Sequence, residues 1–133
     1  YTTLFRSAVF GPRTALNRPE SLFDVATGEI YRGKDGYAVF YQRWLSAFPD
    51  GKIEILNTLS SGDSVVVEYM GRGTQTGTLV GASGELPPTG RHVELRICEI
   101  YDFNQGQLIQ GRSYYDLMTL LHQLGALERP KAA

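Results

Sequence analysis

Aromatic and apolar side chains recur with a helical period in one segment before the middle of the chain. They occupy positions i, i+3, i+4, i+7, i+10 and i+11, namely Tyr37, Phe40, Tyr41, Trp44, Ala47 and Phe48. This spacing places them on one face of an amphipathic helix. Asp35 is the expected N-cap and Pro49 the expected stop.

A second helical period lies near the C-terminal end. Four leucines repeat at i, i+3, i+4 and i+7, namely Leu117, Leu120, Leu121 and Leu124. They predict a short helix, and Gly125 supplies a residue suited to ending it.

The chain between the two helices has the pattern of strands. Residues 52–59, 64–74, 92–103 and 107–115 are rich in β-branched and aromatic residues, and residues 104–106 form a tight turn. Residues 81–90 read GASGELPPTG and predict a loop. We expect one more strand over residues 22–32, and only a ragged or short helical piece over residues 8–20.

Helices followed by consecutive strands predict an α+β fold. We expect a cone-shaped, curved antiparallel sheet with N-terminal helices packed on its concave face and a short C-terminal helix. The 133 residues fit a single domain.

Composition removes several classes of function. The net charge of −1 and the pI of about 6.1 argue against nucleic-acid binding. A single Cys98 and two histidines argue against an internal disulfide and a zinc site, and no apolar run is long enough to span a membrane. We therefore expect no metal, no cofactor and no membrane partner, and a cytoplasmic location.

The first seven residues have a feature of their own. YTTLFRS is what translation of the end of a common short-read sequencing adapter gives, and the chain does not begin with Met. We expect residues 1–7 to be an assembly artefact, as can arise in metagenomic reads, and the N-terminal helix to be truncated.

Side chains in the last strand alternate between two faces. Leu108, Gln110, Arg112, Tyr114 and Asp116 share one face. If that face points into the concavity, Arg112, Tyr114 and Asp116 gather in one place. Asp116 directly precedes the leucine helix, so it is either an N-cap, with a lowered pKa, or a general base, which gains from a raised pKa.

Five motifs occur in a fixed order along the chain. They are AFPD (47–50), GRGTQTG (71–77), PPTGR (87–91), DFNQGQLI (102–109) and RSYYDLMTLLHQLG (112–125). Together they resemble the SnoaL-like polyketide cyclases, or ester cyclases, over about residues 33–127. That family belongs to the nuclear-transport-factor-2-like group of cone-shaped α+β folds.

The resemblance implies a reaction and a base. In the family, an aspartate at the end of the last strand removes a proton from an activated carbon, and the enolate closes a ring by intramolecular aldol attack. Asp116 matches that position. Gln75 stands where the family commonly has His, and an amide cannot titrate.

The resemblance also implies a pocket for a small, apolar or aromatic, polyketide-like substrate. We expect Arg112, Tyr114 and Gln75 to contact it, and the walls to include Trp44, Tyr41, Phe48, Tyr69 and Tyr101. Three alternatives remain open: Arg112 and Tyr114 serve only ion pairing and packing, the domain is a non-catalytic binding or dimerisation module, or Asp116 activates water for epoxide-type hydrolysis. By analogy with such folds we expect a homodimer.

Overall fold

The computed structural model describes residues 21–81 and 84–127. The expected artefact at residues 1–7 and the expected helical piece at residues 8–20 lie outside the described residues. The elements follow the chain in this order: β1 (Ser21–Asp24), β2 (Glu29–Arg32), α2 (Gly33–Ala47), β3 (Lys52–Ser61), β4 (Ser64–Thr74), β5 (Leu79–Gly81), β6 (Gly84–Leu86), β7 (His92–Asn104), β8 (Gln107–Tyr115) and α3 (Leu117–Gln123).

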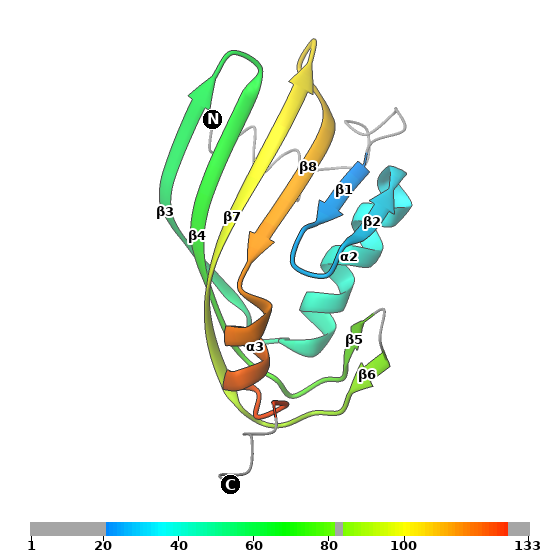
Figure 1. The fold of residues 1–133 in the computed structure, drawn as a ribbon, viewed down its shortest axis with the longest axis vertical. Helices are drawn as coiled ribbons and strands as arrows, with labels where there is room; N and C mark the ends of the chain where they lie inside the picture. Colours follow the sequence, from blue (N-terminus) through cyan, green and yellow to red (C-terminus); the bar gives the residue numbers. More distant parts are fainter. Residues whose placement is uncertain (1–20, 82–83, 128–133) are drawn as a thin grey trace, which may run out of the picture.

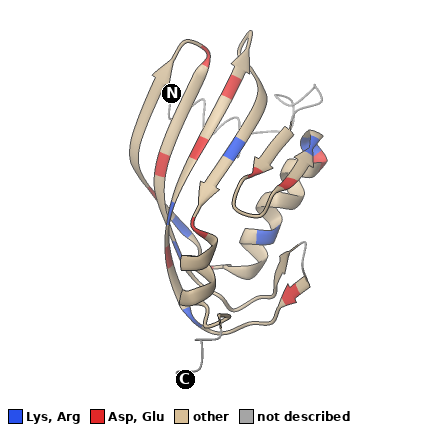
Figure 2. Cartoon of the chain, viewed as in Figure 1, with Lys and Arg blue, Asp and Glu red and all other residues tan. Residues whose placement is uncertain are grey.

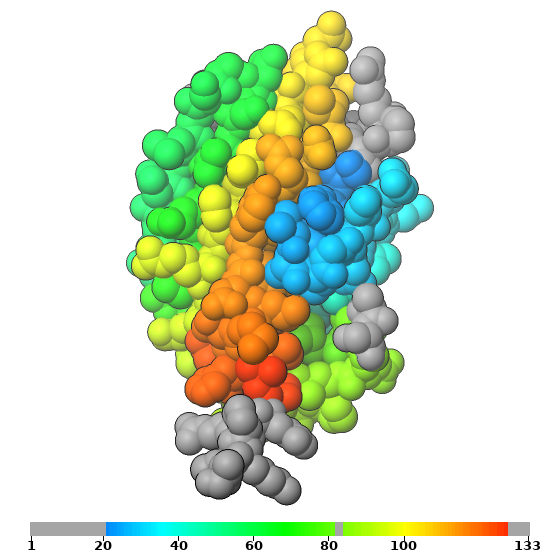
Figure 3. Space-filling model, viewed as in Figure 1, coloured from blue at the N-terminus to red at the C-terminus, as the bar shows by residue number. Residues whose placement is uncertain are grey.

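A six-stranded curved sheet forms the body of the α+β cone, in the order β2-β1-β8-β7-β4-β3 (Figure 1). The sheet is mixed, because β1 runs parallel to β8, whereas all other neighbouring strands of this sheet pair antiparallel. The expectation of a wholly antiparallel sheet is therefore wrong at this one pair. The space-filling view shows the blue β1–β2 segment packed beside the orange β8 (Figure 3).

The strand expected over residues 22–32 is a hairpin of two short strands. Residues 25–28 form its turn, and Gly28 adopts a φ of 82°. Glycine enters this left-handed region without steric cost, so Gly28 allows the chain to reverse there. The sequence-based expectation missed this turn inside an otherwise β-like run.

Helix α2 begins two residues before the expected N-cap. Arg32 occupies the cap position without a side-chain hydrogen bond, and Asp35 lies in the first turn. An acidic side chain there still interacts favourably with the helix dipole. The expectation that Asp35 caps the helix is therefore wrong.

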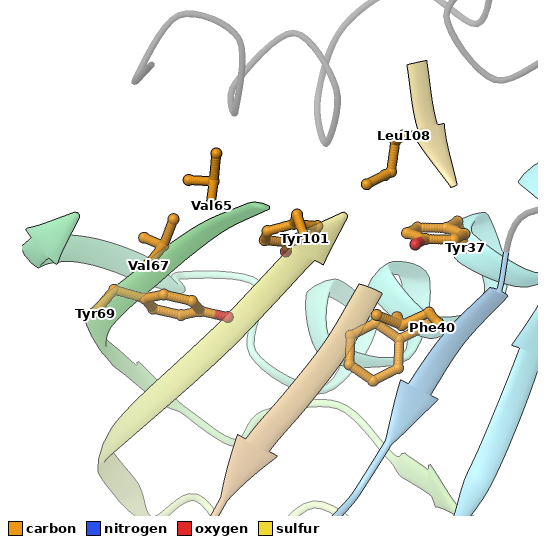
Figure 4. Close-up of a cluster of buried hydrophobic side chains, with 8 residues drawn as sticks. Tyr37, Phe40, Val65, Val67, Tyr69, Tyr101 and Leu108 are labelled. Atoms are coloured by element: carbon orange, nitrogen blue, oxygen red, sulfur yellow. The ribbon is translucent and has the colours of Figure 1, made fainter. Parts of the chain in front are cut away.

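The aromatic face of α2 packs against the inner face of the sheet. Tyr37 and Phe40 are buried in one cluster with side chains from β1, β4, β7 and β8, namely Leu22, Val65, Val67, Tyr69, Tyr101 and Leu108. Figure 4 shows how residues from these separate elements fill the same space. Burying this apolar surface fixes the helix across the concave side of the sheet.

The segment expected as a loop, residues 81–90, overlaps the small hairpin β5–β6, which begins at Leu79. It follows a close contact between Gly77 and the end of α2, where the Gly77 N–H donates to the Ala47 carbonyl at 3.2 Å. A Cβ at Gly77 would lie 1.9 Å from the Ser46 carbonyl oxygen, so no larger residue fits. The segment before β5 is thereby joined to the C-terminal end of α2.

Acidic and basic residues are interspersed along the strands (Figure 2). On the outer face Arg72 bridges Glu54 at 2.7 Å and Glu94 at 3.3 Å. Among the described helices, none has the length and apolar character needed to cross a membrane.

Candidate active site

The inner face of β8 is not the face that simple alternation selects. Leu108 pairs with Phe103 while Gln110 pairs with Asp102, so Ile109 is an extra residue in the ladder. This bulge moves Gly111, Ser113 and Tyr115 to the same side as Leu108. The expectation that Arg112, Tyr114 and Asp116 meet inside the concavity is therefore wrong.

Asp116 is exposed and caps α3. Its Oδ1 accepts the Met118 N–H at 3.0 Å, and its Oδ2 accepts the Thr119 hydroxyl at 2.6 Å. The Thr119 hydrogen bonds are the main reason that the pKa of Asp116 is lowered. Asp116 is not among the residues that line the pocket described below.

Arg112 and Tyr114 lie on the outer face of β8. The Arg112 guanidinium donates to Asp102 Oδ2 at 2.7 Å and forms an ion pair with it. Tyr114 pairs with Cys98 across the strands and is 39% exposed. Neither side chain lines the pocket, so neither is placed to contact a substrate there.

Gln75 is fully buried and holds a neighbouring loop. Its amide nitrogen donates to the Leu86 and Pro87 carbonyls, and its amide oxygen accepts the Thr89 N–H and hydroxyl. The side chain is thus occupied by the loop that follows β6. Gln75 lies outside the pocket lining, contrary to the expected substrate contact.

An apolar pocket lies between α2 and the inner face of the sheet, with a cavity volume of about 150 Å³. Of the expected wall residues, Trp44, Tyr41, Phe48 and Tyr69 line it. Further walls come from β3, β4, β7, β8 and α3, including Ile53, Gly71, Val93, Leu95, Ile97 and Leu120. A cavity of this volume holds a ligand of about the size of one benzene ring.

Glu99 supplies the carboxyl group of this lining. It lies on β7, where the inner face reads Val93, Leu95, Ile97, Glu99 and Tyr101. The side chain is 1% exposed. An acid in a row of apolar inward residues is unusual, because a buried charge is costly unless it is hydrogen-bonded.

Three hydroxyl groups donate to the Glu99 carboxylate. Tyr69 donates to Oε1 at 2.9 Å, Ser113 donates to Oε1 at 3.2 Å, and Tyr101 donates to Oε2. Burial raises the pKa of Glu99, and the hydrogen bonds lower it only in part. Glu99 is therefore a stronger base than a solvated glutamate, yet its ionised form is supported.

Tyr101 has a different place from the one expected. It is 1% exposed and lies behind the pocket lining, with its hydroxyl 3.1 Å from that of Tyr41. The pair extends the hydrogen-bond network from Glu99 to α2. Burial raises the pKa of Tyr41 and Tyr101 well above the usual value, so both hydroxyls stay neutral.

A second buried carboxyl lies beside Glu99 on the same inner face. The register pairs Asp24 with Ser113 and Ser113 with Glu99, which forms one row across three strands. Neighbouring strands are about 4.8 Å apart, so the Asp24 and Glu99 backbones are roughly 10 Å apart. Asp24 Oδ2 accepts the Tyr115 hydroxyl at 2.9 Å.

Asp24 has fewer partners than Glu99. It is 0% exposed, and its Oδ1 has no hydrogen-bond partner among the described residues. Burial raises the pKa of Asp24, while Tyr115, Thr27 and Arg43 lower it only in part. Asp24 therefore keeps its proton to a higher pH than a solvated aspartate does.

The alternation of side chains along β7 is a sequence signal for Glu99. Every second residue from Val93 to Tyr101 is apolar or aromatic except Glu99, so the acid had to face the core. Asp24 and Ser113 gave no comparable signal, because they meet only through the pairing of β1 with β8. Within the described ranges, no three His, Cys, Asp or Glu side chains group as metal ligands.

Comparison with known proteins adds the family. The sequence profile described as SnoaL-like polyketide cyclase matches residues 19–124. The chain belongs to the SnoaL-like polyketide cyclase family. Its members process small molecules, in agreement with an apolar pocket.

Solved structures share the nuclear-transport-factor-2-like, ketosteroid isomerase-like fold of this SnoaL-like chain. A candidate SnoaL-like polyketide cyclase from Jannaschia sp. CCS1 has a TM-score of 0.80 and 21% identity, covering 96% of this chain and 92% of that one. TsrD from Streptomyces laurentii has a TM-score of 0.75 and 25% identity over 95% and 92%. A protein of ketosteroid isomerase-like fold from Catenulispora acidiphila has a TM-score of 0.72 and 17% identity over 97% and 96%. The comparison with curated proteins found no match.

Proposed function

We propose that this protein is a cyclase or isomerase that removes a proton beside a carbonyl group of a small polyketide-like compound. The observation that carries the proposal is Glu99, a buried carboxylate with a raised pKa in an apolar pocket. Such a base can take a proton from an activated carbon without help from a metal. The resulting enolate closes a ring by intramolecular aldol attack.

The pocket supports this reaction in two further ways. Its walls exclude water around the base, which strengthens electrostatic interactions with the reacting atoms. Its volume of about 150 Å³ restricts the enclosed part of the substrate to about one six-membered ring. A folded chain held in that space has its reacting carbons close together.

The base proposed here is Glu99 in place of Asp116. Asp116 is occupied by the start of α3, and its lowered pKa makes it a weaker base. Glu99 faces the cavity. The alternative roles expected for Arg112, in substrate contact or in orienting water, lose support because Arg112 pairs with Asp102 on the outer face.

The test compares Glu99→Gln with Asp116→Asn. The probe is an open-chain β-keto methyl ester whose chain ends in a methyl ketone three methylene groups away. NMR follows exchange of the activated C–H in D₂O, and mass spectrometry follows ring closure. We expect Glu99→Gln to lower both rates by about 100-fold or more, and Asp116→Asn to keep both within about threefold.

Glutamine keeps the size of Glu99, and asparagine is also a good helix cap, so both changes are conservative. The reverse result, in which Asp116→Asn is inactive and Glu99→Gln active, would assign the base to Asp116. A wild-type protein that accelerates neither exchange nor ring closure of the probe would contradict the proposed function. Binding of the probe without turnover would instead support a binding module.

A further inference from the structure

An aldol ring closure moves two protons, and Glu99 accounts for one of them. The base takes a proton from carbon, the carbon–carbon bond forms, and the attacked carbonyl becomes an alkoxide that needs a proton. A second group in the pocket must supply that proton. Tyr69, Tyr101 and Ser113 are poorly placed to do so, because their hydroxyls donate to Glu99.

Tyr115 has the required position. Its side chain lines the pocket and lies edge-on to Trp44, with ring centroids 5.6 Å apart. On the sheet it pairs with Ile97, which pairs in turn with Tyr69, so Tyr115 and Tyr69 flank one row of the inner face. Tyr69 contacts the base, and Tyr115 contacts a different carboxyl.

That carboxyl, Asp24, lies behind Tyr115 and is absent from the pocket lining. The hydroxyl of Tyr115 is 2.9 Å from Asp24 Oδ2. If Asp24 is neutral, its own proton can lie on the Tyr115 oxygen, and the Tyr115 proton is then free to point into the pocket. The direction of this one hydrogen bond decides whether Tyr115 can donate to a ligand.

The two acids differ in the hydrogen bonds that they accept, although burial raises the pKa of both. Glu99 accepts three hydroxyl donors, which support the ionised form. Asp24 accepts one and leaves Oδ1 without a partner among the described residues. Paired acids whose environments differ in this way commonly divide the roles of base and acid.

Charged groups near Asp24 only partly oppose its neutral form. Arg43 on α2 attracts the ionised form of Asp24, but its guanidinium is already paired with Glu29 at 2.9 Å. Thr27 in the turn after β1 also supports the ionised form of Asp24. The charge of Asp24 in turn raises the pKa of Glu99. Burial outweighs these contributions and raises the pKa of Asp24.

We propose that Tyr115 and Asp24 form the proton-donating arm of the pocket, beside Glu99 on the same face of the sheet. This proposal rests on the proposed function. Tyr115 gives its hydroxyl proton to the alkoxide oxygen, and Asp24 passes its carboxyl proton to the Tyr115 oxygen. The cycle ends with Glu99 protonated and Asp24 ionised, and one proton returns from Glu99 to Asp24. Ser113, which lies between them in the row, offers a short route for that return.

Tyr115 is thus a catalytic residue, and Asp24 a positioning and proton-supplying residue behind it. The donor acts after proton removal from carbon, so the two arms can be measured separately. C–H exchange of the β-keto ester reports Glu99 alone, whereas ring closure needs both arms.

The first variant is Tyr115→Phe, with Tyr31→Phe as the matched control. Tyr31 also donates its hydroxyl to a carboxylate, Glu29, at 2.9 Å, but it lies outside the pocket lining. We expect Tyr115→Phe to lower kcat of ring closure by about 100-fold, with KM and the rate of C–H exchange within about threefold of wild type. Tyr31→Phe should leave all three unchanged.

A rate of ring closure in Tyr115→Phe within about threefold of that in Tyr31→Phe would overturn the proposal. If Glu99→Gln still loses C–H exchange in that case, the proposed function stands without this donor. Glu99→Gln therefore tests the proposed function, and Tyr115→Phe tests the proposed proton donor.

Asp24→Asn provides an independent readout and guards against misfolding of Tyr115→Phe. Because Asp24 must be protonated to act, the wild-type rate of ring closure should fall as the pH rises through the Asp24 pKa. We expect this alkaline limb to disappear in Asp24→Asn, with a lower and flatter profile. An unchanged alkaline limb in Asp24→Asn would overturn the role of Asp24.

Discussion

Asp116 shows how one carboxylate can satisfy a sequence motif and still have a structural task. It directly follows β8, where the resemblance implies a catalytic aspartate, but both of its oxygens bind the first turn of α3. These hydrogen bonds stabilise the ionised carboxylate, which lowers the pKa of Asp116. Its contribution to stability is therefore tied to pH.

This pH dependence is a testable property of Asp116. A carboxyl whose pKa is lower in the folded than in the unfolded state stabilises the fold above the unfolded value and loses that effect as the pH falls through the folded value. We expect Asp116→Asn to be less stable than wild type near neutral pH, and the difference to vanish in acid. Urea unfolding of both proteins across the acid range would measure it, and a difference that grows toward acid would contradict it.

Glu99 and Asp116 also show which residue-level inferences the sequence supported. Asp116 was recognised as a cap or a base from the leucine period that follows it. Its orientation depended on the face of β8, and the extra residue Ile109 changed that face. Alternation alone does not reveal a single inserted residue, although each insertion moves the side chains that follow it to the opposite face of the sheet.

At the scale of elements, the loop after β6 depends on one buried amide. Gln75 makes four side-chain hydrogen bonds to Leu86, Pro87 and Thr89. Its backbone also joins Gly90 and Arg91. An imidazole in this position would titrate, whereas an amide keeps these bonds independent of pH.

We expect Gln75→Leu to lower the free energy of unfolding by about 3 kcal/mol, because it leaves buried carbonyl and N–H groups without partners. The matched control is Gln42→Leu on the exposed side of α2, which should stay within about 0.5 kcal/mol of wild type. Equilibrium urea unfolding measures both. A loss for Gln75→Leu no larger than that for Gln42→Leu would show that the loop does not depend on this amide.

The elements themselves were largely predictable, and their pairing was not. The aromatic period gave α2, the leucine period gave α3, and the β-rich runs gave β3, β4, β7 and β8. The hairpin β5–β6 was not predicted. The turn at residues 25–28 and the parallel contact of β1 with β8 were missed. Local patterns report which face of an element is apolar, but a contact between segments this far apart leaves no local pattern.

At the scale of the whole molecule, the pocket should couple ligand binding to global stability. Trp44 is the chain's single tryptophan and lines the pocket, so its fluorescence reports occupancy. We expect cyclohexanone, a one-ring ketone, to change this fluorescence and to stabilise the fold. The gain should be about 2.7 kcal/mol when free ligand is about 100 times its Kd.

Gly71→Leu is the control for pocket occupancy. Gly71 lines the pocket, and a Cβ there meets only ordinary contacts, the nearest being Ile97 Cδ1 at 3.5 Å. A leucine side chain can therefore enter the cavity without displacing backbone. The variant should fold and lose the response to cyclohexanone; an equal response in both proteins would place the ligand elsewhere.

The parallel contact of β1 with β8 also sets when the site can exist during synthesis. Asp24 and Tyr115 are 91 positions apart in the chain. A ribosome adding about 5–20 residues per second needs roughly 5 to 20 seconds to make the second after the first. Until β8 has left the exit tunnel, the nascent chain has neither the strand that β1 pairs with nor the tyrosine that Asp24 binds. The proton-donating pair is thus among the last parts of the molecule to form, and a nascent chain that stops before β8 has no such pair.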